Sequence, residues 1–348
     1  MIRVLVCDDS AFMRRAICSM LATDPKVTVV DTANNGREAV ELARKHRPDV
    51  ITMDVEMPEM DGLTALRTIM AECPTQVIML SSLTTAGSRA AMQALRLGAA
   101  DVLAKDQSQV STKIMSLQED LLMRVHALAG SKPPTASHSG VRRIESSKFR
   151  AGQFDLVVIA SSTGGPPVLE NILTHVPAGS RIPIVVAQHM PAVFTKSMAD
   201  RLNEHCAVPV RHLEDKMPIE PGVVHIAPGG TNTHIRKAGS RMTVHVSRDP
   251  EGTIYFPSAN VLFQTAAEVV GRRTLAIVLT GMGDDGVRGA RTLVEAGGTV
   301  LAQSAETCVV YGMPKAVTQS ALAMESLSPE ELAGVLASVA SPAAMRVA

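Results

Sequence analysis

The sequence predicts an α/β protein of two domains, each built on a mostly parallel sheet, and three observations carry that prediction. A chain of 348 residues is too long for one ordinary core and comfortable for two. Short apolar runs alternate with helix-like patterns in both halves. Between the halves, the stretch SKPPTASHSGVRRIESSKFRAGQ is rich in Ser, Pro, Gly and basic residues, as linkers are. We therefore expect domains at 1–125 and 153–345 and a linker at 126–152.

The first half contains five apolar runs, each followed by a helical pattern. Five such βα units predict a parallel sheet with helices on both faces. The expected strands are 2–7, 27–31, 49–53, 76–80 and 101–104, and the expected helices are 11–21, 36–46, 62–71, 88–97 and 111–128.

The second half also predicts a doubly wound α/β domain. The expected strands are 155–160, 182–188, 223–227, 242–246, 274–280 and 299–302, with helices between them at 168–176, 261–270 and 287–295. A last helix is expected to begin at Ser328-Pro329-Glu330-Glu331, which has the N-cap serine, the first-turn proline and the glutamate of a capping box.

Composition disfavours several classes of function. Lys plus Arg and Asp plus Glu both number 34, and aromatic residues make up 2%, which argues against a basic, base-stacking nucleic-acid binder. The five cysteines form no Cys-x-x-Cys pair, which favours reduced thiols in the cytoplasm. No apolar run approaches the ~20 residues of a membrane-spanning helix. We expect a cytoplasmic monomer with no membrane insertion and no nucleic-acid partner.

Polar residues follow four of the first five predicted strands. Asp8 and Asp9 follow the first, Asp54 ends the third, Ser81 the fourth and Lys105 the fifth. Ligands of open α/β sheets bind at the carboxyl ends of the strands. Converging carboxylates suit Mg²⁺, a carboxylate can attack phosphorus, and Lys and Ser side chains can hold the acyl phosphate. Any one of these residues alone is more often a cap or loop residue, but their shared position at the strand ends favours a pocket.

The first 125 residues or so resemble the receiver domain of two-component response regulators. The resemblance rests on Cys7-Asp8-Asp9-Ser10, Met53-Asp54-Val55-Glu56-Met57-Pro58-Glu59-Met60-Asp61-Gly62, Leu80-Ser81-Ser82 and Lys105. It implies a flavodoxin-like fold that is phosphorylated with Mg²⁺ as cofactor. The implied roles are Asp54 as phosphoacceptor, Asp8, Asp9, Asp54 and the backbone carbonyl of Glu56 as metal ligands, and Ser81 and Lys105 as switch residues.

Two positions depart from the common receiver pattern. Val102 stands where many receivers have an aromatic residue, and Asp106 follows the lysine where proline is usual. Phosphorylation is expected to survive both changes, but the usual aromatic switch cannot operate here.

Three motifs in the second half place Ser, His and Asp after predicted strands. Ser161-Ser162-Thr163-Gly164-Gly165 opens a helix, where N–H groups favour developing negative charge. Gln188-His189-Met190-Pro191 follows the next strand, and Gly283-Asp284-Asp285-Gly286 follows a third. Alone, the serine motif is equally well explained by a structural turn, a given histidine is usually not catalytic, and Gly-Asp-Asp-Gly is an ordinary turn. Together they suggest a nucleophile, a base and an orienting acid, and no histidine spacing suggests a catalytic metal.

The chain to about residue 340 resembles the chemotaxis receptor methylesterase family, which joins a receiver to this hydrolase-like domain. The ordered set is Ser-Ser162-Thr-Gly-Gly, Gln-His189-Met-Pro, Ile226-Ala-Pro-Gly-Gly230, Pro257-Ser258, Leu279-Thr-Gly-Met-Gly-Asp-Asp285-Gly and Tyr311-Gly-Met-Pro314. The resemblance implies Ser162 as nucleophile, His189 as general base and acid, and Asp285 as the group orienting the imidazole. Backbone N–H groups near Thr163 and Met282 are candidates for the oxyanion site.

The same resemblance implies substrates and partners. Glutamyl methyl esters on methyl-accepting chemotaxis receptors would be hydrolysed and certain glutamines deamidated, with no cofactor for this reaction, and a chemotaxis histidine kinase would supply the phosphoryl group. Ser161 is a rival nucleophile and Asp284 a rival acid, although the motif register favours Ser162 and Asp285. Asn260 and Ser304 stand near positions where relatives commonly have aspartate.

The sequence alone leaves two alternatives to this function open. One is the same hydrolase serving a receptor outside chemotaxis, and the other is a response regulator whose second half binds a partner without catalysis.

Overall fold

The computed structural model describes residues 1–105, 112–131, 148–239, 241–248 and 255–342. The chain divides into two compact units, Met1–Ser137 and His138–Ala348, which are described separately. Residues 106–111 and 132–147, including Asp106 and most of the expected linker, lie outside the described residues. Within the described ranges, no helix combines the length and the apolar character needed to cross a membrane.

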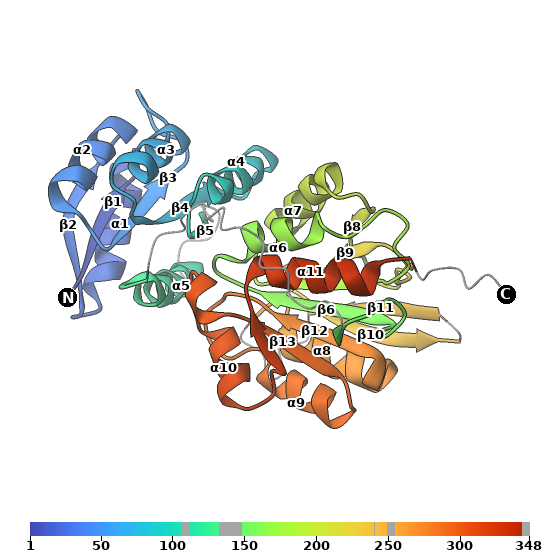
Figure 1. The fold of residues 1–348 in the computed structure, drawn as a ribbon. Helices are drawn as coiled ribbons and strands as arrows, with labels where there is room; N and C mark the ends of the chain where they lie inside the picture. The colour runs from blue at the N-terminus through green and yellow to red at the C-terminus, as the bar shows by residue number, and fades with distance from the viewer. Residues whose placement is uncertain (106–111, 132–147, 240, 249–254, 343–348) are drawn as a thin grey trace. The chain divides into compact units, whose positions relative to one another are not determined.

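The first unit is a five-stranded parallel sheet in the order β2-β1-β3-β4-β5, with five helices (Figure 1). Helix α1 packs against α5, while α3 contacts both α2 and α4, so the helices form two groups, as this strand order requires. The elements are β1 (Ile2–Cys7), α1 (Ala11–Ala22), β2 (Val27–Ala33), α2 (Gly36–His46), β3 (Val50–Asp54), α3 (Gly62–Glu72), β4 (Gln76–Ser82), α4 (Thr85–Arg96), β5 (Asp101–Lys105) and α5 (Thr112–Leu128).

All five predicted βα units are therefore confirmed, with boundaries shifted by up to three residues. Helix α2 begins where the sequence predicts, because the Asn35 side chain accepts a hydrogen bond from the N–H of Glu38. Strand β3 is buried at every position, which explains why it is a continuous apolar run with no alternation. Helix α5 continues to Leu128, past the expected domain end at residue 125.

The second unit contains a seven-stranded parallel sheet in the order β14-β13-β12-β6-β7-β9-β8 and a separate antiparallel hairpin, β10-β11. Its strands are β6 (Leu156–Ser161), β7 (Ile184–Gln188), β8 (Val210–His212), β9 (Val224–Ile226), β10 (Asn232–Ala238), β11 (Arg241–Ser247), β12 (Thr274–Val278), β13 (Thr299–Gln303) and β14 (Glu325–Leu327). Its helices are α6 (Gly165–Leu173), α7 (Ala192–His205), α8 (Ala259–Val269), α9 (Val287–Glu295), α10 (Met313–Gln319) and α11 (Pro329–Ala340), with short 3₁₀ turns at Gly271–Arg273 and Ala305–Thr307.

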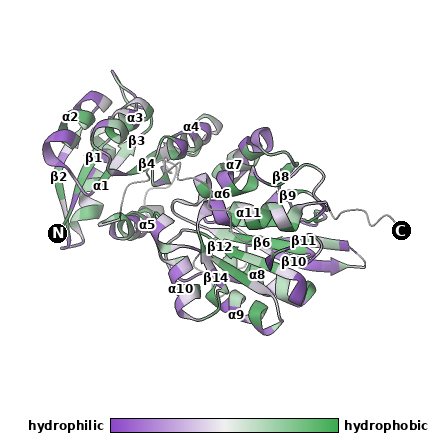
Figure 2. Ribbon diagram, viewed as in Figure 1, coloured by the Kyte–Doolittle hydropathy of each residue, from purple (hydrophilic) through white to green (hydrophobic). Residues whose placement is uncertain are grey.

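Helices α6, α7 and α11 pack together, and α8, α9 and α10 form a second packed group (Figure 1). The central strands of this sheet are strongly hydrophobic in Figure 2, and every residue of β6 and β12 is buried. The capping box at Ser328 is present as predicted, with its hydroxyl accepting from the Glu331 N–H. The fold class predicted from the sequence is thus confirmed for both units.

One predicted strand lies outside the parallel sheet. Residues 242–246 lie in β11, which pairs with β10 as an antiparallel hairpin packed on α8 instead of joining the parallel sheet. Strand β10 was not predicted, because its sequence NTHIRKA is polar and its last three residues are exposed.

Candidate functional site

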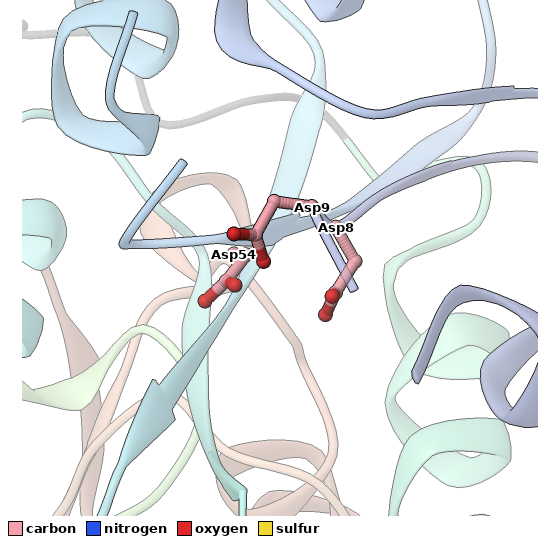
Figure 3. Close-up of side chains that lie close together, drawn as sticks. All are labelled: Asp8, Asp9 and Asp54. Carbon is pink, nitrogen blue, oxygen red and sulfur yellow. The ribbon is translucent and has the colours of Figure 1, made fainter. Parts of the chain in front are cut away.

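The first candidate site is the acidic pocket at the carboxyl end of the first sheet. One carboxylate oxygen from each of Asp8, Asp9 and Asp54 lies within 4.8 Å of the others. Figure 3 shows Asp8 and Asp9 on consecutive residues of one segment, with Asp54 beside them on its neighbour. Asp8 and Asp54 are buried, whereas Asp9 is exposed. Three converging oxygen ligands with one open side match the donor preference of Mg²⁺.

Lys105 compensates the buried charge in this pocket. Its Nζ lies 2.6 Å from Asp8 Oδ2 and 2.7 Å from Asp54 Oδ2. Burial nevertheless raises the pKa of the Asp54 carboxyl above its usual value, since it outweighs the attraction of Lys105. The pocket is a cavity of about 150 Å³ whose lining also includes Glu56 and Ser81. The strand-end residues singled out in the sequence therefore do come together.

Ser81 is held in this structure by the start of α4. Its Oγ donates a hydrogen bond of 2.9 Å to the carbonyl oxygen of Gly87. A Cβ at Gly87 would lie 2.4 Å from the carbonyl oxygen of Ser82, so β4 and α4 are in close contact here. Val102, which replaces the usual aromatic residue, is 3% exposed and belongs to the core.

The second candidate site is built on three adjacent strands, β12, β6 and β7. Ser161 pairs with Gln188 across β6 and β7, so Ser162 and His189 leave the sheet side by side. The His189 N–H donates to the Ser161 carbonyl oxygen at 3.0 Å. On the other side of β6, the Ser162 N–H donates to the Thr280 carbonyl oxygen at 3.0 Å.

The turn after β12 lies directly against Ser162. A Cβ at Gly281 would be 2.6 Å from the Ser162 Cβ and 2.6 Å from the Met313 Sδ, so only glycine fits. The next residue, Met282, is buried, and its N–H donates to no acceptor in the part of the chain that the structure describes. Gly164, with φ of 77°, caps α6, whose first residue, Gly165, comes three positions after Ser162.

His189 and Asp285 form a buried pair. His189 Nε2 lies 2.8 Å from Asp285 Oδ2, and their side chains are 7% and 2% exposed. A carboxylate oxygen can only accept, so Nε2 carries the proton of the neutral imidazole. The other ring nitrogen, Nδ1, is buried and has no hydrogen-bond partner among the described residues. The imidazole therefore has one fixed nitrogen and one unprotonated nitrogen available as a base.

Asp285 is held by the N-terminus of α8. Its Oδ1 accepts from the Ser258 Oγ and from the Asn260 N–H, each at 3.0 Å, and its Oδ2 accepts from the Ala259 N–H at 2.6 Å. Burial alone raises the pKa of Asp285, but the hydrogen bond and charge of His189 and the two N–H groups outweigh it, so the pKa lies below its usual range. Asp285 is therefore ionised at neutral pH.

The rival serine has a different environment. Ser161 is fully buried, and its Oγ donates to Gln188 Oε1 at 2.5 Å. The Gln188 amide in turn donates to the carbonyl oxygens of Ser162 at 3.0 Å and His189 at 3.3 Å. Gly165 makes room for this pair, because a Cβ there would lie 2.6 Å from Gln188 Oε1. Ser161 thus ties together the two segments that carry Ser162 and His189.

Sequence reasoning missed two parts of this site. Ser258 was expected only as part of a motif, and Asn260 only as a departure from the relatives' aspartate. Their contact with Asp285 bridges 25 to 27 residues of chain, which no local pattern encodes. Tyr255 was not noted at all, although its ring stacks on that of His189 with centroids 4.9 Å apart. The serine that caps α8, Ser258, was the signal that could have indicated the contact with Asp285, since helix N-termini bind carboxylates.

Both halves of the chain match known protein families. The CheB methylesterase model matches residues 157–336, and the response regulator receiver domain model matches residues 4–115. The protein-glutamate methylesterase/protein-glutamine glutaminase 1 of Oleidesulfovibrio alaskensis is 44% identical and covers 96% of this chain and 98% of that protein. The protein-glutamate methylesterase/protein-glutamine glutaminase 2 of Nitratidesulfovibrio vulgaris is 42% identical, covering 97% and 98% respectively.

A solved structure agrees with these matches. The methylesterase catalytic domain of Thermotoga maritima CheB is 38% identical and has a TM-score of 0.52, covering 53% of this chain and 97% of that domain. Relatives therefore match along almost the whole chain, and a solved catalytic domain matches the half that carries Ser162, His189 and Asp285. The chain belongs to the CheB methylesterase family, as an enzyme that joins a receiver domain to a methylesterase domain.

Proposed function

We propose that this chain hydrolyses glutamyl methyl esters and deamidates specific glutamines on methyl-accepting chemotaxis receptors, and that phosphorylation at Asp54 activates it. The observation that carries the chemistry is the His189–Asp285 pair at 2.8 Å, with Nδ1 unpartnered beside the strand end that carries Ser162. The names of the relatives support the substrate, since both are protein-glutamate methylesterase/protein-glutamine glutaminases.

The reaction begins at Ser162. Its hydroxyl attacks the ester carbonyl while His189 Nδ1 takes the hydroxyl proton. Asp285 holds the Nε2 proton and stabilises the imidazolium that forms. Methanol leaves with the proton returned from Nδ1, and water, activated by the same nitrogen, releases the glutamate. A glutamine side chain follows the same path with ammonia as the leaving group.

The oxyanion of the tetrahedral intermediate is proposed to bind backbone N–H groups at Met282 and Thr163. The Met282 N–H donates to no described acceptor and lies one residue beyond Gly281, which touches Ser162. Thr163 opens the turn that leads into α6, whose N-terminus favours negative charge. Each such donor is typically worth about 2.7–4 kcal/mol of transition-state stabilisation.

The receiver is proposed to supply the switch. Asp54 takes the phosphoryl group from a chemotaxis histidine kinase. Asp8, Asp9, Asp54 and the Glu56 carbonyl would hold Mg²⁺, which would neutralise phosphoryl charge when bound. Lys105 contacts Asp54, and Ser81 lines the same cavity, which supports the proposal that both side chains hold the phosphoryl oxygens. The esterase reaction itself is proposed to need no cofactor.

We also propose that the domains run over 1–125 and 153–345 with a linker at 126–152, and that the chain acts as a cytoplasmic monomer without nucleic-acid partners. The family matches at 4–115 and 157–336 support this division.

The test is methanol release from methylated receptor membranes, with and without acetyl phosphate and Mg²⁺. Wild type, Ser162→Ala and Asp54→Asn are compared, with Ser161→Ala as the matched control for the neighbouring hydroxyl. Release that requires Ser162 but not Ser161, and that rises with acetyl phosphate only when Asp54 is present, supports both the chemistry and the switch. Near-normal release by Ser162→Ala would refute the nucleophile. Phosphorylation at Asp54 with no release from chemotaxis receptors would refute the substrate.

A further inference from the structure

The ring of Tyr255 covers one face of His189. The two rings are parallel to within 5°, with centroids 4.9 Å apart, which is an offset stack. Tyr255 is partly exposed, whereas the His189 side chain is 7% exposed. The tyrosine therefore separates one face of the imidazole from solvent.

The far end of Tyr255 lies on the turn that carries Met282 and Asp285. A Cβ at Gly283 would be 2.3 Å from the Tyr255 Oη and 3.0 Å from its Cζ, and Gly283 has φ of 74°. Glycine at this position thus leaves room for the hydroxyl. The ring is held between the base and the turn that orients the base.

Asp285 alone does not fix the orientation of the imidazole. Its hydrogen bond to Nε2 holds one ring atom, and rotation of the imidazole about its bond to Cβ would change the direction in which Nδ1 points. A flat ring stacked on the imidazole opposes that rotation, because a tilted imidazole would push its edge into the face of Tyr255. No other residue among those described stacks on His189.

We propose that Tyr255 is a positioning residue for His189, which holds the imidazole in the plane where Nε2 meets Asp285 and Nδ1 faces Ser162. This inference rests on the proposed function of His189. Tyr255 makes no contact with the reacting atoms in this role and acts through the base. Segment 255–260 then serves both partners of Ser162, with Tyr255 on the histidine and Ser258, Ala259 and Asn260 on the aspartate.

The test compares Tyr255→Phe, which keeps the flat ring, with Tyr255→Leu, which keeps apolar bulk without it. In the full-length protein, Tyr255→Leu is expected to lower kcat for methyl ester hydrolysis about tenfold, equivalent to about 1.4 kcal/mol, with KM changed less than about twofold. Tyr255→Phe is expected to retain most of the wild-type kcat. Equal losses in the two variants, or a loss confined to KM, would overturn the positioning role.

An NMR measurement distinguishes the positioning of His189 by Tyr255 from a general loss of structure. It also remains informative if the proposed reaction is wrong. The proton between His189 Nε2 and Asp285 is followed by NMR, which needs no substrate. Faster exchange of this proton with water in Tyr255→Leu than in wild type and Tyr255→Phe supports the proposal. Unchanged exchange in a folded Tyr255→Leu protein would overturn it, whatever Ser162→Ala shows for the reaction.

If Tyr255→Leu does not fold, substitutions at Gly283 test the same contact. Gly283→Ala adds a Cβ where the tyrosine hydroxyl lies, so it is expected to displace the ring and lower kcat. Adding Tyr255→Phe removes the hydroxyl and should recover part of that loss. A double variant no more active than Gly283→Ala alone would contradict the proposed contact.

Discussion

Replacing Asp285 with Asn directly tests whether this carboxylate orients His189 as the base. Each of its two oxygens accepts hydrogen bonds from two donors. Oδ1 accepts from Ser258 and Asn260, and Oδ2 accepts from His189 and Ala259. An asparagine must direct its NH₂ group at one of these pairs. Either orientation places a donor against a backbone N–H in a buried site.

The magnitude follows from these contacts. One buried N–H without an acceptor costs about 1–3 kcal/mol, so the free energy of unfolding of the second unit should fall by about that amount. Loss of the charge that stabilises the imidazolium removes a further ~1.5–3 kcal/mol from the transition state, or about 10- to 150-fold in kcat. The orientation that makes His189 accept at Nε2 also protonates Nδ1, and a wrong tautomer of this kind lowers kcat about 10⁴-fold in a serine protease triad.

The assay is steady-state methanol release, with Asp284→Asn as the matched control. Asp284 is the adjacent acid, is exposed and makes no side-chain hydrogen bond among the described residues. We expect kcat to fall about 10²- to 10⁴-fold in Asp285→Asn, since both effects act on the transition state, and to stay unchanged in Asp284→Asn. Near-normal turnover by Asp285→Asn, or a collapse in Asp284→Asn, would refute the assignment.

The same substitution has a signature in acid unfolding. Because the pKa of Asp285 in the folded protein lies below its unfolded value, its stabilising contribution is complete above the unfolded pKa of about 3.9 and is lost as the pH falls through the folded pKa. The free energy of unfolding of Asp285→Asn should therefore fall less steeply below about pH 4 than that of wild type. Identical slopes would show that the carboxylate is not stabilised by folding.

Three further predictions concern other parts of the chain. Lys105→Met leaves the buried carboxylates of Asp8 and Asp54 without their cation, so it should lower the free energy of unfolding of the first unit by about 3–5 kcal/mol in chelator. The loss should be clearly smaller in millimolar Mg²⁺, and equal losses in the two conditions would argue against a metal at these aspartates. Ser161→Ala leaves Gln188 Oε1 without its donor and should cost about 1–3 kcal/mol of stability, while Ser162-dependent turnover persists; loss of all turnover would revive Ser161 as nucleophile. Partial burial raises the pKa of Cys308 to about 12 and of Cys206 to about 11, so both should resist alkylation at pH 8. Rapid labelling detected by mass spectrometry would contradict the raised pKa values.

The strand-end rule explains why so much of both sites was predictable from the sequence. Parallel strands bring their carboxyl ends to one edge, so residues after β1, β3 and β5 meet without any knowledge of side-chain packing. Asp8, Asp54 and Lys105 were placed together on this basis, and their contacts agree with it.

The remainder depends on contacts that cross between elements. Asp285 meets the N-terminus of α8 because α8 and α9 pack against each other, and periodicity in neither segment encodes that contact. Strand β10 was missed because its residues are polar and its pairing with β11 is what makes it a strand. Tyr255 lies beside His189 across 66 positions of sequence, so it carries no local signal of its own.

The tight packing at Gly281 limits how this protein can vary. In a library of random variants selected for ester hydrolysis, substitutions of Gly281 should be depleted as severely as those of Ser162, because even one added methyl group would collide with the nucleophile and with Met313. A residue with no side chain would thus score as indispensable. Intolerance to substitution at this turn would then reflect the lack of space beside Ser162 and not a chemical role of Gly281. If Gly281→Ala variants survived the selection, the turn would be able to move.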